Sequence, residues 1–514
     1  MSSPLPWQTI AQKAQQHRDT TLSLIDPPIP DIHPLPLDST TIPKTILTSE
    51  ELAITESDPV DLVSKLSSGS LTSTQITKSF LRRAALAQKL SNCVTELLPV
   101  KALERAEFLD GYLKEHGKPI GPLHGLPISV KEHINIASLP CNAGFIAWHD
   151  RIPTSNAHLI DILLAAGAVL YARTTQPQTL MHLSTSSAFF PHTTNPYNRH
   201  LTAGGSSGGE GALLGLRGSC LGIGTDIGGS IRSPAANCGV YGFRPTSLRL
   251  PISGFSATML GQEHVVPVVG PLSTSLEGVG LFMRTVLGSE PWRRDQGLVP
   301  MPWREGGGWG VKIGVLWDDG VVKPHPPILR ALKEVVEKLQ GVEGVEVVEW
   351  KPYRHDYAWS IIASLYFCDG GRRMNGENEW VKKLSVKEIW EWQIKRDAYK
   401  LEYAQLWGDV DGPGAAPPLD CARYWGYTSQ WNLLDYPAIV FPVTKVDQTF
   451  DLAETEYVPR NEKDKYNYEL YSPDTYTNAP VSLQLVGKRY EDEKVIEALE
   501  YIQEKIGLPF VDFV

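Results

Sequence analysis

The spacing of hydrophobic residues predicts that helices and strands alternate along most of the chain. Helical spacing over residues 73–112 is followed by a strand-like segment over 121–136, and a helix ending near Gly167 leads into a strand at 169–173. After residue 310 the pattern predicts a strand (311–319), a helix (328–340) and a strand (345–350), whereas the Trp- and Tyr-rich residues 357–431 are predicted to be helical. This alternation is typical of layered α/β folds, so we expect an α/β protein.

The first 75 residues differ in pattern from the rest of the chain. Two helical segments, at 7–25 and 49–69, flank a proline-rich stretch at 27–43. We interpret residues 1–75 as an N-terminal helical extension that wraps the core, and residues 76–514 as one large domain. A chain of 514 residues with 42% hydrophobic content can bury such a core without disulfides or metals.

Composition and charge exclude several classes of partner. The chain has 48 Lys and Arg against 58 Asp and Glu, a net charge of −10 and no long basic run, so no nucleic acid partner is expected. No stretch of about 18 apolar residues and no signal-like N-terminus is found, which predicts a cytoplasmic protein without a membrane span. The sequence leaves a homodimer open.

Cysteine and histidine spacing gives no indication of a metal or another cofactor. The six cysteines lie far apart, without a C-x-x-C pair or closely spaced histidines beside them. We interpret His124 and His133, which lie on either side of Lys131, as solvated or core histidines rather than ligands. Neither a metal site nor a cofactor is therefore expected.

Residues 200–245 hold 13 of the 44 glycines. A flexible linker is the common meaning of such a tract, but this one contains apolar, strand-like segments that linkers lack. A phosphate-binding loop would end in Gly-Lys-Ser or Gly-Lys-Thr, which is absent. A third interpretation is a tight turn that carries a nucleophile, because glycines permit the close backbone approach that such a turn needs.

The segment TDIGGSIR fits this third interpretation best. Gly228 and Gly229 leave backbone N–H groups unshielded just before the Ser230 hydroxyl, and acyl transfer needs such donors about 2.7–3.1 Å from the developing oxyanion. There is no G-x-S-x-G elbow, which disfavours a Ser-His-Asp triad. A Ser-Lys pair remains, and Lys131 in the apolar segment PISVKEHI is the candidate base because burial lowers a lysine pKa. A strand lysine is, however, more often a surface residue.

These segments resemble the signature of a known family. GGSSGGEGALLG followed by GIGTDIGGSIRSPAANCGVYGFRPT resembles the amidase signature, and GPLHGLPISVKE resembles the lysine motif of that family. The intervals agree as well, with 75 residues from Lys131 to Ser206 and 24 from Ser206 to Ser230. The resemblance runs from about residue 76 onward and is strongest to the fungal acetamidase and general amidase branch.

The resemblance implies a large mixed central β-sheet covered by helices on both faces, with residues 76–514 as the catalytic domain. It implies hydrolysis of the C–N bond of small to medium neutral amides, and of carbamates or anilides, through an acyl-enzyme on Ser230. Ser206 would bridge Ser230 to the base Lys131, and the Gly205–Ser206 peptide bond would be cis. The further residues implied are Ile227, Gly228, Gly229 and Ser230 for the oxyanion hole, Leu180 beside the acyl group, and Ser207, Asp226 and Arg232 as supports.

Two alternatives stay open, namely a fatty-acid-amide-type hydrolase of the same family and a catalytically silent member that binds a ligand. Glu210 stands where the amidotransferase members carry small residues, so that branch is disfavoured. The departures from the fungal pattern are Ser184 in place of an acidic residue, Phe189, Phe190 and Pro191 in place of a polar turn, and Ala203 in place of proline. We expect Phe189 and Phe190 to make the acyl-binding wall apolar.

Overall fold

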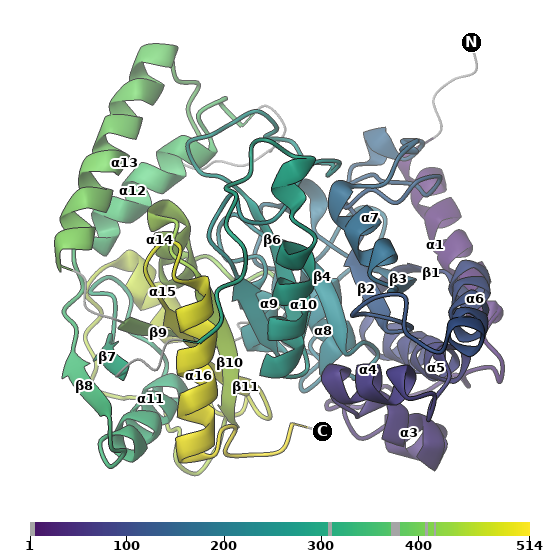
Figure 1. Ribbon diagram of the computed structural model, residues 1–514. Helices are drawn as coiled ribbons and strands as arrows, with labels where there is room; N and C mark the ends of the chain where they lie inside the picture. The colour runs from purple at the N-terminus through teal and green to yellow at the C-terminus, as the bar shows by residue number, and fades with distance from the viewer. Residues whose placement is uncertain (1–5, 307–310, 372–380, 407–409, 416–417, 514) are drawn as a thin grey trace.

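A mixed sheet of eleven strands crosses the whole molecule in the computed structural model, which describes residues 6–306, 311–371, 381–406, 410–415 and 418–513 (Figure 1). The strand order is β1-β3-β2-β4-β6-β5-β10-β11-β9-β7-β8. The strands are β1 (Val94–Leu97), β2 (Pro127–Lys131), β3 (Val169–Thr174), β4 (Leu221–Asp226), β5 (Tyr241–Arg244), β6 (Val268–Ser273), β7 (Val311–Val315), β8 (Val345–Glu349), β9 (Val410–Ala415), β10 (Ala438–Lys445) and β11 (Pro480–Val486).

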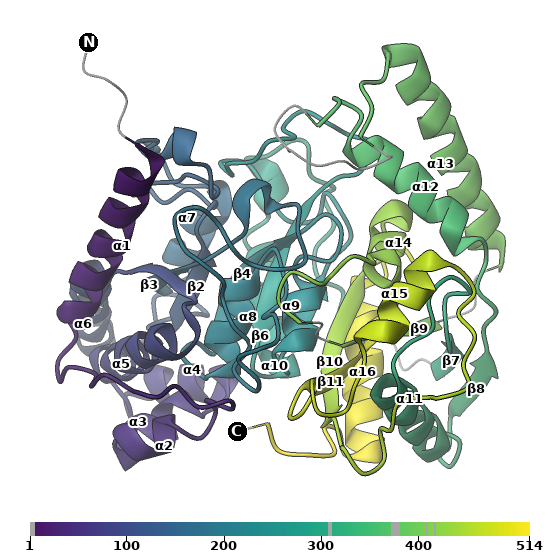
Figure 2. The same cartoon turned by 180° about the vertical axis from the view of Figure 1, so that it is seen from behind.

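Helices cover both faces of this sheet. In Figure 1 α10 and α16 lie in front of the strands, and the view from behind in Figure 2 brings α8 and α9 to the front. The helices are α1 (Trp7–Ser23), α2 (Pro43–Ile46), α3 (Ser49–Thr55), α4 (Pro59–Ser67), α5 (Ser73–Ser91), α6 (Pro99–His116), α7 (His158–Ala165), α8 (Gly208–Gly215), α9 (Arg232–Asn237), α10 (Leu276–Gly288), α11 (Pro326–Leu339), α12 (His355–Tyr366), α13 (Val386–Leu406), α14 (Gly426–Leu434), α15 (Glu462–Leu470) and α16 (Asp492–Ile506), with short 3₁₀ turns η1 (Ile146–Trp148), η2 (Gln178–Leu180) and η3 (Pro291–Arg293).

Local sequence explains why these elements form. On α11, Ile328, Leu332, Val335 and Leu339 recur at helical spacing and are buried, so one stripe of the helix faces the core. The helix α5 begins with a capping box in which Thr72 and Gln75 satisfy each other's backbone N–H groups. The strands β2 and β4 are buried along their full length, as expected for parallel strands with helices on both faces.

The pairing of β2 with β4 positions the glycine-rich segment. The two strands are parallel, with Ser129 opposite Gly222 and Val130 opposite Ile223. Their carboxyl ends therefore meet at one edge of the sheet, where open α/β sheets commonly bind ligands. Lys131 ends β2 and Asp226 ends β4, so the predicted base and the predicted nucleophile turn lie at the same edge.

The structure confirms the α/β prediction, with a large mixed sheet between helices, and corrects two details. Residues 73–112 are not continuously helical, because β1 separates α5 from α6 and pairs with β3. Within the predicted helical region 357–431, residues 410–415 form β9, which pairs with β11; residues 372–380, 407–409 and 416–417 lie outside the described residues. The boundary at residue 75 stays a prediction, although α1 packs against β1 and α3 packs against α5.

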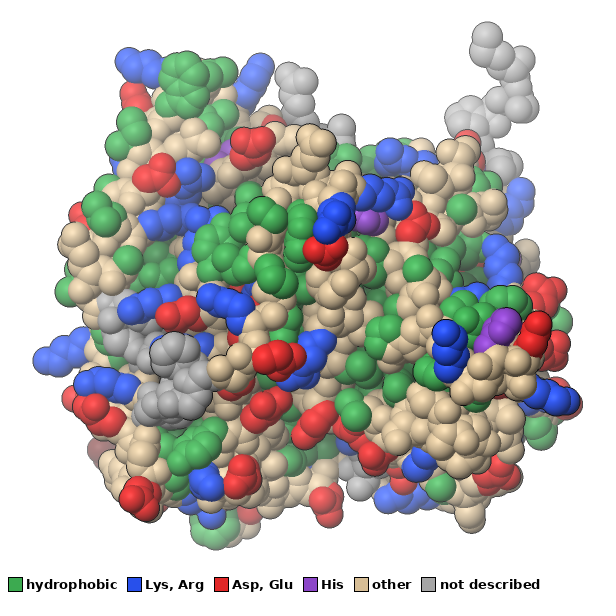
Figure 3. Space-filling view, viewed as in Figure 1, with side chains coloured by type: hydrophobic (Ala, Val, Ile, Leu, Met, Phe, Trp, Pro, Cys, Tyr) green, Lys and Arg blue, Asp and Glu red, His purple; other side chains and the backbone are tan. Residues whose placement is uncertain are grey.

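The surface mixes charges of both signs. On the face shown in Figure 3, Lys and Arg side chains are interspersed with Asp and Glu side chains. Within the part of the chain that the structure describes, no helix is both long enough and apolar enough to cross a bilayer.

Candidate active site

Lys131 is fully buried and surrounded by hydroxyl groups. Its Nζ lies 2.7 Å from Ser206 Oγ, 2.9 Å from Ser207 Oγ and 3.1 Å from Thr225 Oγ1. Burial lowers the pKa of this lysine to about 7, although the more distant carboxylates of Asp226 and Glu210 act to raise it. A substantial fraction of Lys131 is therefore neutral near pH 7, as a general base requires.

Ser206 and Ser207 lie at the end of the loop that precedes α8. The Gly205–Ser206 peptide bond is cis, as the resemblance implies. Ser207 N donates to the carbonyl oxygen of Ser230 at 3.1 Å, so this loop is tied to the turn after β4. Ser207 thus links Lys131 to the Ser230 turn, and Ser206 precedes it in the same loop.

Ser230 lies in the turn that joins β4 to α9, and 6% of its surface is exposed. Asp226 fixes this turn by accepting hydrogen bonds from Gly229 N at 2.8 Å and Ile231 N at 3.1 Å. Among the described residues, no hydrogen bond joins the hydroxyls of Ser206 and Ser230. The structure therefore brings Ser206 directly to Lys131, and holds Ser230 in the adjoining turn.

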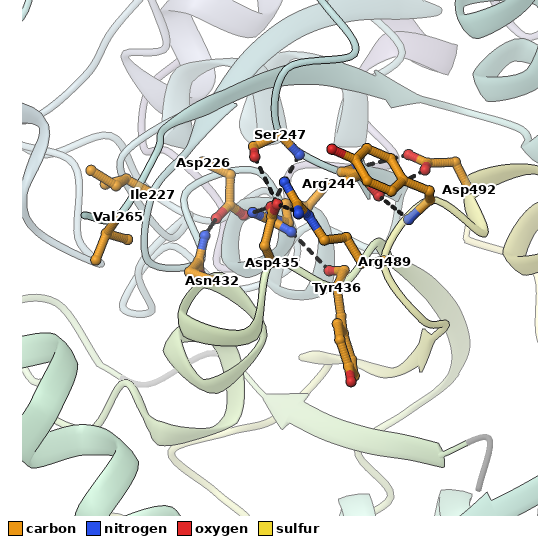
Figure 4. A network of polar contacts seen from close by, with 12 residues as sticks. Asp226, Ile227, Arg244, Ser247, Val265, Asn432, Asp435, Tyr436, Arg489 and Asp492 are labelled. Atoms are coloured by element: carbon orange, nitrogen blue, oxygen red, sulfur yellow. Dashed lines mark hydrogen bonds and ion pairs between the residues drawn. The ribbon is translucent and has the colours of Figure 1, made fainter. Parts of the chain in front are cut away.

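The predicted supports Asp226 and Arg232 form a buried ion pair behind the turn. Arg232 Nε donates to Asp226 Oδ2 at 3.0 Å. Asn432 Nδ2 donates to Asp226 Oδ1 at 2.8 Å (Figure 4). Burial acts to raise the pKa of Asp226, but the Arg232 guanidinium and these hydrogen bonds hold it below its usual range. Asp226 is therefore a fixed anion. Figure 4 also shows a second acidic centre nearby, in which Asp435 accepts from Arg244.

Leu180 ends η2 in an unusual backbone conformation. Leu180 has a φ of 64° and Thr179 a φ of 73°, which is the left-handed region that non-glycine residues seldom adopt. Such outliers cluster at functional sites. The segment that follows is bound to the loop before Ser206, because Thr185 Oγ1 donates to Gly204 O at 2.8 Å. The place of Leu180 beside the acyl group stays a prediction.

Phe189 and Phe190 do not take the predicted place in the acyl-binding wall. Both are buried, but they pack beside α1, where Gln15 Nε2 donates to Phe189 O at 2.7 Å. The guanidinium of Arg18 lies 5.4 Å from the centre of the Phe190 ring. Residues of α1, including His17, line a cavity together with both phenylalanines. The two rings therefore belong to the contact with the N-terminal helix, a long-range contact that the sequence does not reveal.

The other residues that depart from the fungal pattern, Ser184, Pro191 and Ala203, make structural contacts with neighbouring residues. Ser184 is buried, and its Oγ accepts from Thr202 Oγ1 at 3.1 Å, so a hydroxyl suffices where an acidic residue was expected. Pro191 contributes its carbonyl oxygen, which accepts from Asn92 Nδ2 at 3.0 Å. Ala203 is buried beside Cys238. None of these residues is hydrogen-bonded to Lys131, Ser206 or Ser230.

A cluster of apolar side chains adjoins the turn on the side of α12 and α14. Met181, Val265 and Tyr366 are buried in one hydrophobic cluster, and Ile227 and Trp425 pack against it. Figure 4 shows Ile227 and Val265 next to each other. A cavity of about 150 Å³ lies beside α9, lined by Leu183, Arg232, Ser233, Trp425 and Thr428 among others. The turn that carries Ser230 therefore has apolar side chains on one side and, beside α9, a cavity with both polar and apolar lining.

Sequence reasoning missed Thr225, which completes the surroundings of Lys131. Thr225 contacts Lys131 and is also 2.9 Å from His133 Nε2, whose pKa burial lowers to about 3, so His133 is a neutral core histidine. His124 is also buried, as a core histidine would be. Thr225 was detectable, because it precedes Asp226 in the same strand. Within the described ranges, no group of His, Cys, Asp and Glu side chains is arranged to hold a metal ion.

Comparison with known proteins identifies relatives over nearly the whole chain. A sequence model of the family described as Amidase matches residues 75–408. The chain is 39% identical to an acetamidase of Emericella nidulans, over 90% of this chain and 91% of the relative, and 38% identical to an acetamidase of Aspergillus oryzae, over 90% and 92%. The solved structure of a fatty acid amide hydrolase superposes with a TM-score of 0.93 at 35% identity, covering 98% of this chain and 96% of that one.

Proposed function

Because this chain belongs to the amidase family and is a hydrolase of amide C–N bonds, we propose that Ser230, Ser206 and Lys131 are its catalytic triad. The observation that carries the proposal is the 2.7 Å contact between the buried Lys131 Nζ and Ser206 Oγ. A serine hydroxyl is a weak nucleophile until a base takes its proton. A buried lysine with a lowered pKa, reached through a second hydroxyl, supplies that base.

The proposed reaction has two halves. Neutral Lys131 takes a proton from Ser206, and Ser206 takes a proton from Ser230. At the same time the Ser230 Oγ forms a bond to the substrate carbonyl carbon. Ser206 then passes a proton to the leaving nitrogen and takes one back from the Lys131 ammonium. The C–N bond breaks, Lys131 is neutral again, and an acyl-enzyme remains on Ser230. Water, activated by the same relay, releases the carboxylic acid. The relay requires the Oγ atoms of Ser206 and Ser230, which are not hydrogen-bonded to each other in the described structure, to come within hydrogen-bond distance when the substrate is bound.

The turn supplies the donors for the oxyanion. Since the N–H of Gly229 is already bonded to Asp226, we assign the oxyanion hole to the N–H groups of Ile227, Gly228 and Ser230. Gly229 instead allows the backbone of the turn to adopt a φ of 125°, a conformation that other residues rarely take. Each correctly placed donor contributes about 2.7–4 kcal/mol to lowering the barrier.

The preferred substrates are neutral amides of small to medium size, together with carbamates or anilides. The apolar surroundings of Ile227 and Trp425 favour an apolar acyl or aryl group, at about 25 cal/mol per Å² buried. A charged acyl group would lose its hydration against these apolar side chains. The acetamidases among the relatives support amides of this class. All six cysteines are free thiols, which fits the cytoplasmic location that we propose.

A second candidate substrate class is the fatty-acid amides. The similarity to the fatty acid amide hydrolase structure, with a TM-score of 0.93 at 35% identity, favours it. The dependence of kcat/KM on acyl-chain length separates the two candidates. In a site for medium acyl groups kcat/KM stops rising beyond a certain chain length, whereas in a site for long chains it should rise with each added CH₂ group.

Ammonia release from acetamide, hexanamide, benzamide, oleamide and succinamate tests these proposals together. We expect kcat/KM to rise from acetamide to hexanamide and benzamide, and to be very low for the anionic succinamate. Ser230→Ala should lower turnover of every substrate by at least about 10³-fold. A further steep rise to oleamide would favour the second candidate, and substantial turnover by Ser230→Ala would refute the triad.

A further inference from the structure

Two hydroxyl groups, one from α12 and one from α14, donate hydrogen bonds to carbonyl oxygens of the Ser230 turn. Tyr366, the last residue of α12, donates its Oη to Ile227 O, and Thr428 of α14 donates its Oγ1 to Gly228 O at 2.6 Å. We propose that Tyr366 and Thr428 are positioning residues that aim the backbone N–H groups of this turn at the oxyanion. The inference rests on the proposed function of the turn.

Peptide geometry links these carbonyl contacts to the donors. In a trans peptide the C=O and the following N–H point in opposite directions. The contact of Tyr366 with Ile227 O therefore directs the N–H of Gly228 away from α12. Likewise, Gly229 O accepts from Ser233 N at 2.7 Å, so the N–H of Ser230 points away from α9. The N–H groups of Gly228 and Ser230 are thus oriented by the hydrogen bonds that the carbonyl oxygens of Ile227 and Gly229 accept.

The peptide between Gly228 and Gly229 is held at both ends. Thr428 binds its carbonyl oxygen, and Asp226 Oδ1 accepts from its N–H at 2.8 Å. This peptide cannot rotate without breaking one of the two contacts. It therefore holds two of the three assigned donors, Gly228 N–H and Ser230 N–H, at a fixed spacing.

The glycines of the turn make room for these anchors. A Cβ atom on Gly228 would lie 3.0 Å from Tyr366 Oη and 3.2 Å from the Trp425 ring, and one on Gly229 would overlap the Thr428 side chain. Burial also raises the pKa of Tyr366 well above its usual value, so its hydroxyl remains a donor. Both glycines are therefore required where α12 and α14 approach the turn most closely.

The anchors act on the transition state rather than on substrate binding. Donors that are already oriented stabilise the oxyanion as it forms, whereas the neutral carbonyl of the bound amide gains less from them. Loss of one anchor should lower kcat by about fivefold to tenfold, the scale of one neutral hydrogen bond, with KM within about twofold of wild type.

The test compares Tyr366→Phe and Thr428→Val with a matched control, Tyr399→Phe. Tyr399 is also buried in the same cluster and donates to a backbone carbonyl, Tyr353 O at 2.8 Å, but that carbonyl is not in the turn. The readouts are kcat and KM for hexanamide, and inhibition by a trifluoromethyl ketone of similar size, which adds to a serine to give a tetrahedral oxyanion. Thr428→Ser, which keeps the hydroxyl, should restore most of the activity.

We expect kcat/KM and affinity for the ketone to fall by the same factor in Tyr366→Phe and Thr428→Val, and to stay within twofold of wild type in Tyr399→Phe. Unchanged kcat in both turn variants, an equal loss in Tyr399→Phe, or a loss confined to KM would overturn the inference. Ser230→Ala is measured in parallel. If that variant is inactive while the turn variants are normal, only the inference on the anchors fails; if it retains turnover, the proposed function fails and the inference with it.

Discussion

At the scale of single residues, the burial of Lys131 determines the chemistry of the site. Within the described residues the lysine has no ion-pair partner, and its three close contacts are the hydroxyls of Ser206, Ser207 and Thr225. The nearby carboxylate of Glu210 bonds instead to Ser129, at 2.5 Å. Lys131 is thus desolvated without a strong ion pair, and this combination lowers its pKa to about 7.

The pH dependence of activity follows from this pKa. The base must be neutral, so kcat/KM on a neutral amide should rise as pH increases through about 7, with the acid limb reporting one proton. Lys131→Arg should be inactive at every pH, because an arginine keeps its positive charge and cannot accept the proton. Initial rates between pH 5 and 9 check both statements. A rate maximum near pH 4, or an active Lys131→Arg enzyme, would be inconsistent with a lysine base.

At the scale of elements, the junction from β4 to α9 determines where Ser230 lies. Asp226 at the end of β4 pairs with Arg232 at the start of α9, and both side chains are fully buried. The same carboxylate accepts two backbone N–H groups of the turn. The resemblance to the amidase signature implied Asp226 and Arg232 as supports of this turn, and the structure pairs the two side chains. Tyr366 and Thr428 were not predictable, since their contacts join segments 139 and 200 residues apart.

Removal of the Asp226 charge should destabilise the fold. Asp226→Asn leaves the Arg232 guanidinium buried without its counter-ion, and breaking such a pair costs about 3–5 kcal/mol. Urea unfolding gives the free energy directly. Glu346→Gln is the control, because its pair with Lys312 is exposed at 61% and 52% and should contribute less than about 1 kcal/mol. Equal losses in the two variants would show that the buried pair has no special role.

At the scale of the whole molecule, the alternating pattern was enough to predict an α/β fold but not the order of its strands. The strand order depends on long-range pairing, such as β5 with β10, for which a single sequence holds no signal. The strand β9 was missed because its sequence, VDGPGA, is rich in glycine, proline and aspartate, which are uncommon inside strands. Phe189 and Phe190 were misplaced because burial against α1 and burial in a substrate site have the same local pattern.

The most direct test of the central claim is to find which serine forms the covalent intermediate. Trypsin cleaves after Arg199, Arg217 and Arg232, so Ser206 and Ser230 fall in different peptides, 200–217 and 218–232. After reaction with a fluorophosphonate, mass spectrometry should find the adduct on peptide 218–232, and Ser230→Ala should abolish it. An adduct on peptide 200–217, or an active enzyme that is never labelled on Ser230, would contradict the account.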